Sequence, residues 1–133
     1  MKKTGLQFEQ DFYKKVKGVL PITGNYYRPG TRPPENVAKS EDCLVIFKTG
    51  VDGDIQKGYI TINVYVPDTP FDGRKIKDIG RCGIIESSLN EFAETVRLDG
   101  YMIEREGTIT TFQVFETDEH FVHLELKYNY LSI

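Results

Sequence analysis

The only two histidines of the chain lie three residues apart, and with a neighbouring carboxylate they invite a metal-binding interpretation. Imidazole and carboxylate groups are common zinc ligands, and residues two apart on a strand point to the same side of a sheet. His123 and Glu125 therefore share one side, whereas His120 points to the other. No third residue has a spacing that completes a ligand set. We interpret the histidines as surface residues beside a turn and expect no metal site.

A second candidate consists of two carboxylates and a lysine, with Asp68 at the end of one predicted strand and Glu125 and Lys127 on a later one. This set resembles the acidic-acidic-lysine signature of restriction-type nucleases, in which carboxylates hold Mg²⁺ and the lysine stabilises charge developing on phosphate. In those enzymes the two strands lie close in sequence and a helix follows, but here a helix and two strands intervene. The simpler interpretation is a turn residue plus charges on a solvated strand. A magnesium-dependent, nuclease-like enzyme using these three residues is the alternative function.

Serine and cysteine nucleophiles have no supporting context. Ser87 and Ser88 lie within a predicted helix without a glycine elbow, and Cys43 lies in an apolar strand, where burial suppresses the thiolate. The Gly50–Asp54 turn lacks the lysine and following helix of a phosphate-binding loop. Cys43 and Cys82 both have apolar neighbours, so we interpret them as small buried hydrophobic residues and not as a disulfide. We predict that the protein is not an enzyme and needs no cofactor.

Two kinds of residue are suited to binding another protein. Arginines and lysines in two predicted irregular segments can meet phosphate or a partner's carboxylates, although solvated loop charge is the alternative. Tyrosines on one side of a strand bury a large area at low entropic cost, although tyrosines at the margin of the core fit the same pattern. The residues that we predict at a protein interface are Arg28, Arg32, Tyr59, Tyr65, Arg74 and Lys75.

Periodic apolar residues define the elements that would carry these side chains. Apolar residues at three- and four-residue steps predict helices over residues 5–18 and 79–98, the first opened by a Thr4/Gln7 capping box. Alternation and turn residues predict strands over residues 24–28, 42–48, 55–66, 101–106, 108–116 and 120–131. Residues 28–40 and 67–78 are predicted to be irregular, and the long first segment is a candidate binding loop.

The order α-β-β-β-α-β-β-β predicts an α+β fold. The economical packing is a two-layer sandwich, a mainly antiparallel sheet with two α-helices packed on one face. Within residues 55–66, every second residue from Ile60 to Val66 is apolar, while Tyr59, Thr61, Asn63 and Tyr65 occupy the alternate positions. This alternation predicts a sheet with one buried side and one half-polar side.

Length and charge bound the function further. The 133 residues, 39% of them hydrophobic, suffice for one ordinary core but not two, so we predict a single domain over residues 1–133. A formal charge of -3 removes long-range attraction to nucleic acid, and no apolar run approaches the roughly 20 residues of a membrane span. We expect no membrane partner, no sequence-specific nucleic-acid partner, and folding in a cytosol.

Several segments together resemble a known group of proteins. They are residues 24–28 (Gly-Asn-Tyr-Tyr-Arg), Arg32-Pro33, Ser40-Glu41-Asp42, and Gln56-Lys57-Gly58-Tyr59 leading into residues 60–68. Together with the order of elements, these segments resemble the tail-terminator and tail-completion proteins of long-tailed phages and prophages. Proteins of this group join the head to the tail. The likeness covers most of the chain and is one of topology more than of motif.

This resemblance implies a virion structural protein of the tail or neck, assembled in the cytoplasm of the bacterial host. Such a protein forms a ring homo-oligomer, commonly a hexamer, at the head-proximal end of the tail and contacts tail-tube or neck proteins. The implied function is assembly through protein–protein contacts. A monomeric accessory binding domain of a prophage is a further alternative.

Overall fold

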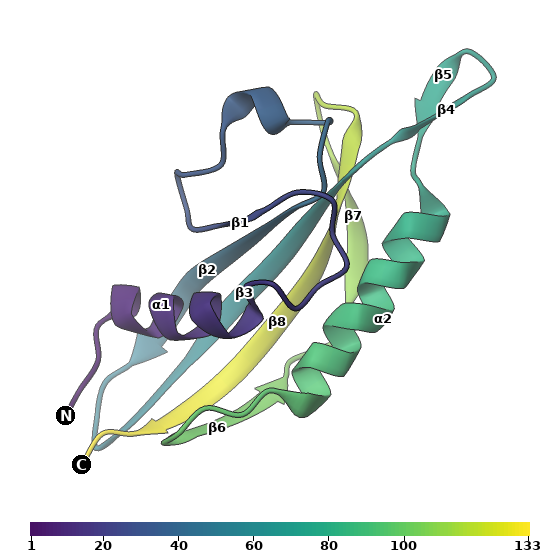
Figure 1. Ribbon diagram of the computed structural model, residues 1–133. Coiled ribbons are helices and arrows are strands. Elements are labelled where there is room, and N and C mark those ends of the chain that lie inside the picture. Colours follow the sequence, from purple (N-terminus) through teal and green to yellow (C-terminus); the bar gives the residue numbers. More distant parts are fainter.

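The computed structural model describes all 133 residues and has the predicted order of elements, with one additional hairpin (Figure 1). The helices are α1 (Gly5–Val16) and α2 (Ile79–Thr95), and a short 3-10 helix spans Pro34–Asn36. The strands are β1 (Tyr26–Tyr27), β2 (Asp42–Val51), β3 (Ile55–Pro67), β4 (Thr69–Phe71), β5 (Arg74–Ile76), β6 (Tyr101–Arg105), β7 (Thr110–Val114) and β8 (Glu119–Leu131). Neither helix has the length and apolar character that a membrane crossing requires.

A six-stranded sheet forms the second layer of the molecule. Its strands follow the order β1-β2-β3-β8-β6, and β7 also pairs with β8. All pairs are antiparallel except the short parallel pair of β1 with β2. β7 pairs with the first half of β8 and β6 with its second half, so these two strands share one edge of the sheet. The predicted α+β two-layer sandwich is confirmed, and Figure 1 shows both helices on the same side of the sheet.

The core lies between that side of the sheet and the helices. The predicted inward row of β3, from Ile60 to Val66, is fully buried, and so is the matching row of β8 from Val122 to Leu126. β3 and β8 pair with Ile62 opposite Leu124, which places the two rows next to each other. The helices complete the core with buried side chains that include Phe8, Phe12 and Val16 of α1 and Ile85, Leu89 and Phe92 of α2.

Local signals locate the helices well. The Thr4/Gln7 capping box is present, since the Thr4 hydroxyl accepts from the Gln7 backbone N–H and the Gln7 side chain accepts from that of Thr4. α1 ends at Val16, two residues before the predicted end, because Lys17 already leaves the helical conformation. The Asp78 side chain caps the start of α2 by accepting from the Arg81 backbone N–H. Both cysteines, Cys43 and Cys82, are free and buried.

The prediction of an irregular segment over residues 67–78 is wrong, because a two-stranded hairpin, β4–β5, occupies its centre. The turn of this hairpin is Asp72-Gly73, and both residues have positive φ, 51° and 77°. Those values match a type I′ turn, whose twist suits an antiparallel ribbon. Each strand has only three residues, and Pro70 interrupts one of them. Strands of three residues are too short to show the apolar–polar alternation by which a sequence predicts a strand.

Candidate interaction surface

The side of the sheet opposite the helices has no second layer over it, and we call it the open face (Figure 1). Its residues follow from the strand register, since they alternate with those of the core. They include Ile46 of β2, Tyr59, Thr61, Asn63 and Tyr65 of β3, Met102 of β6, Phe112 of β7, and Phe121, His123, Glu125 and Lys127 of β8. The half-polar side predicted for β3 is therefore the middle of this face.

One end of the open face carries an aromatic patch, which consists of Tyr65, Phe112, Phe121 and His123. The ring centroids of Tyr65 and Phe121 lie 5.7 Å apart, and those of Phe112 and Phe121 lie 5.4 Å apart. His123 meets the edge of Phe112 at 6.0 Å. Phe112 keeps 46% of its surface exposed. An aromatic cluster that is partly exposed to solvent on a sheet is suited to binding another protein surface.

The opposite end of the open face carries a second apolar patch, made of Ile55, Met102 and Leu131. Ile55 pairs with Leu131 across β3 and β8, and Met102 of β6 pairs with Asn129, two residues before Leu131 on the same side of β8. The three side chains line a shallow hollow of about 420 Å³. Met102 is 74% exposed. The open face thus has apolar ends.

Polar side chains separate the two patches. Lys48 Nζ lies 3.1 Å from a Glu125 carboxylate oxygen, and His123 Nδ1 lies 2.8 Å from Asn63 Oδ1. Burial lowers the pKa of His123, and nearby Lys48 acts in the same direction, whereas Glu125 opposes both. Each of the side chains in these two contacts thus has a polar or charged partner on another strand, as is common in sheets.

The structure separates the residues of the metal and nuclease hypotheses. His123 and Glu125 share the open face, while His120 lies on the helix side and contacts Asp68 at 2.7 Å. No three His, Cys, Asp or Glu side chains gather where they could hold a metal ion. Asp68 follows the end of β3, seven residues beyond the partner of Glu125, which is about 23 Å at roughly 3.3 Å per residue. Asp68, Glu125 and Lys127 therefore do not converge on one site.

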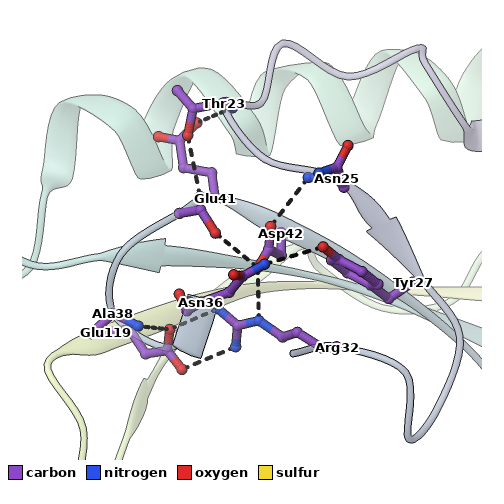
Figure 2. Close-up of polar contacts among 10 residues, drawn as sticks. Thr23, Asn25, Tyr27, Arg32, Asn36, Ala38, Glu41, Asp42 and Glu119 are labelled. Carbon is purple, nitrogen blue, oxygen red and sulfur yellow. Dashed lines mark hydrogen bonds and ion pairs between the residues drawn. The ribbon is translucent and has the colours of Figure 1, made fainter. Parts of the chain in front are cut away.

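Arg32 is held inside the molecule and fixes the long 28–40 loop. Its guanidinium lies between two buried carboxylates, with Nε 2.9 Å from Asp42 Oδ2 and Nη2 3.2 Å from Glu119 Oε2 (Figure 2). Its centre stacks 4.5 Å from the Tyr65 ring centroid. Burial acts to lower the pKa of Arg32, but hydrogen bonds to Glu119 and Asp42 outweigh it and raise that pKa. The loop is therefore pinned at the aromatic end of the open face.

The same loop is tied to α1 through Arg28. Its guanidinium donates to Glu9 Oε1 at 2.8 Å, to Gln10 Oε1 at 2.6 Å and to the Leu6 carbonyl at 2.9 Å. Glu9 is buried and also accepts from the Phe47 backbone N–H of β2. The Arg28 side chain is thus committed to contacts within the chain.

Arg74 and Lys75, by contrast, point into solvent on the β4–β5 hairpin, which we call the arm (residues 69–76). Figure 1 shows the arm projecting beyond the sheet and both helices. Both cations are exposed, and Phe71 beside the turn keeps 57% of its surface exposed. The predicted contact residues therefore lie in three places: Arg28 and Arg32 in the pinned loop, Tyr59 and Tyr65 half-buried on the open face, and Arg74 and Lys75 on the arm.

Sequence reasoning missed Phe112 and Phe121, which dominate the aromatic patch. A usable signal existed, because the predicted strands 108–116 and 120–131 are joined by a short turn. Pairing them about that turn places Phe112 opposite Phe121, as the structure does. Met102 and Ile55 had no such signal, since they come together only through their separate pairing with β8.

No family model and no curated protein matches this chain. The functional conclusion therefore depends on the chemistry of its surfaces.

Proposed function

We propose that this protein is an assembly subunit that acts through protein–protein contacts and not through catalysis. The observation that carries this proposal is the open face, where an uncovered sheet presents wet aromatic and aliphatic patches at its two ends. Contiguous exposed apolar surface on a folded domain marks a site of association. The ion pairs that Arg32 and Glu125 form within the chain support the same view, because they leave no convergent reactive groups on this face.

We further propose that the assembly is a ring of identical subunits, of the tail-terminator or tail-completion type. In this proposal the ring, a hexamer in its commonest form, occupies the head-proximal end of a phage tail and contacts tail-tube or neck proteins. The protein would accordingly belong to the virion and assemble in the bacterial cytoplasm. A rigid plate with an uncovered side and a projecting arm supports the proposal, since a closed ring needs two different contact surfaces on each subunit.

The test is the mass of the purified protein across a concentration series, measured by light scattering after size-exclusion chromatography and accompanied by negative-stain electron microscopy. We expect a concentration-dependent shift from monomer to one ring-sized species. Phe112→Ser, in the aromatic patch, should weaken association. Val19→Ser should not, because Val19 is an exposed apolar residue that lies outside the open face, just beyond the end of α1. A strict monomer at all concentrations would contradict the proposal.

A further inference from the structure

The arm has the properties of an element that is completed by a partner. Its strands β4 and β5 form a separate two-stranded sheet that pairs with no other strand. An isolated two-stranded ribbon is at best marginally stable in water. The arm nevertheless presents Phe71, a large apolar side chain, to solvent near its tip.

The arm is also positively charged. Within residues 69–76, Arg74 and Lys75 oppose the single carboxylate of Asp72. None of these three side chains takes part in an ion pair within the chain, although ten pairs form elsewhere. The arm thus offers Phe71 with Arg74 opposite it on the same side of the ribbon, and Lys75 on the other side.

A groove of matching character lies between the C-terminal half of α2 and β6. It has a volume of about 550 Å³, and Ala93, Val96 and Ile103 provide apolar lining. Glu94 and Glu104 are both exposed and line it from two sides of β6, since Glu104 lies opposite the open-face residue Lys127, whose Nζ is 4.0 Å from its carboxylate. In this groove the phenylalanine of an arm would meet an apolar surface, and the two cations of the arm would meet two carboxylates.

The surroundings of the groove are acidic even though it contains two arginines. Arg97 donates to the Glu94 and Val96 carbonyls, and Arg105 donates to Asn90 Oδ1. Residues 91–106 carry five exposed carboxylates against these two cations, namely Glu91, Glu94, Asp99, Glu104 and Glu106, of which Glu94 and Glu104 line the groove. The C-terminal end of α2 adds the partial negative charge of its last carbonyl groups.

The arm cannot reach the groove of its own subunit. The arm leads directly into the start of α2, whereas the groove lies at the end of that helix (Figure 1). From Ile79 at the start of α2 to Ala93 in the groove, 14 residues of helix span about 21 Å at roughly 1.5 Å per residue. A contact between arm and groove must therefore join two copies of the chain head to tail, which produces a ring when the rotation closes.

We propose that the arm of one subunit docks in the α2–β6 groove of the next, with Phe71 on the apolar lining and Arg74 and Lys75 against Glu94 and Glu104. This inference rests on the proposed function and names the contact that builds its ring. It makes the arm the donor and the groove the acceptor of one heterologous interface. The open face, whose aromatic patch the Phe112→Ser variant tests, contributes to association separately from this contact.

Charge reversal tests the contact. R74E/K75E and E94K/E104K should each weaken self-association at least about tenfold, and mixing the two variants, or combining all four changes, should restore it. K14E/K15E is the matched control, because it changes net charge by the same amount as the arm variant at two exposed lysines of α1. Circular dichroism and melting curves establish that each variant folds.

The outcomes separate this inference from the proposed function. Rings that form normally in both reversed variants would refute the arm–groove contact while leaving ring assembly intact, and so would weakened association that the combination does not restore. A wild-type chain that stays monomeric would refute both proposals. An independent readout is R74C/E94C, which should form disulfide-linked multimers on oxidation, since the native Cys43 and Cys82 are buried.

Discussion

Replacing Arg32 by methionine tests whether the pinned loop is a structural part of the molecule. Arg32 is the cationic partner of Asp42 and Glu119, whose side chains are only 1% and 2% exposed. Methionine fills similar space but leaves two buried carboxylates without a cation. The Ala38 backbone N–H and the Ser40 hydroxyl would still donate to them, but neither carries a charge.

The expected cost follows from this geometry. Removing one partner of a buried ion pair costs about 3–5 kcal/mol of the free energy of unfolding. Here the loop can also release from the sheet and let water reach both carboxylates, which limits the loss. We therefore expect Arg32→Met to lower the free energy of unfolding by about 3 kcal/mol, a large part of the roughly 5–15 kcal/mol that holds a domain folded.

Urea denaturation followed by circular dichroism measures this change, with Lys48→Met as the control. Lys48 pairs with Glu125 in an exposed setting, with its side chain 54% exposed, so its loss should cost less than about 1 kcal/mol. Adding Asp42→Asn and Glu119→Gln to Arg32→Met should recover most of the stability, because no uncompensated charge then remains. A change of less than about 0.5 kcal/mol for Arg32→Met at pH 7 would refute the reasoning.

Four further predictions concern the core. Tyr128→Phe should raise the free energy of unfolding by about 1 kcal/mol in urea denaturation, because its buried hydroxyl has no hydrogen-bond partner, and a lowered value would count against this. Burial raises the pKa of Tyr101 and raises that of Tyr128 to about 12. The free energy of unfolding should therefore keep its full value below pH 10 and fall as the pH rises above 10. Melting curves of Tyr128→Phe should show a shallower fall. Burial raises the pKa of the Cys43 thiol and raises that of Cys82 to about 11, so neither thiol should react with a thiol reagent at pH 8 until the chain is denatured. Rapid labelling of the native protein would contradict this prediction. Gly58→Ala should cost about 2 kcal/mol or more by the same denaturation assay, because a Cβ there would lie 2.5 Å from both a backbone carbonyl oxygen and the Tyr128 hydroxyl, and wild-type stability would be unexpected.

The sequence by itself determined the elements and their inward sides. Helical periodicity placed α1 and α2, and strict alternation identified the buried row from Ile60 to Val66. These patterns are local, since a helix or strand must present its apolar residues to one side wherever its partners lie. The α+β class then followed from the order of the elements.

The tertiary structure alone decided which polar residues meet. Arg32 has the sequence character of a loop cation free to bind a partner, yet it is paired with Glu119, 87 residues away. Phe112 and Met102 share the open face only because β7 and β6 pair with the two halves of β8. The arm projects because its two short strands pair with each other and with no strand of the main sheet. Strand partners and charge pairs of this kind depend on long-range register, which a local pattern of residue types does not encode.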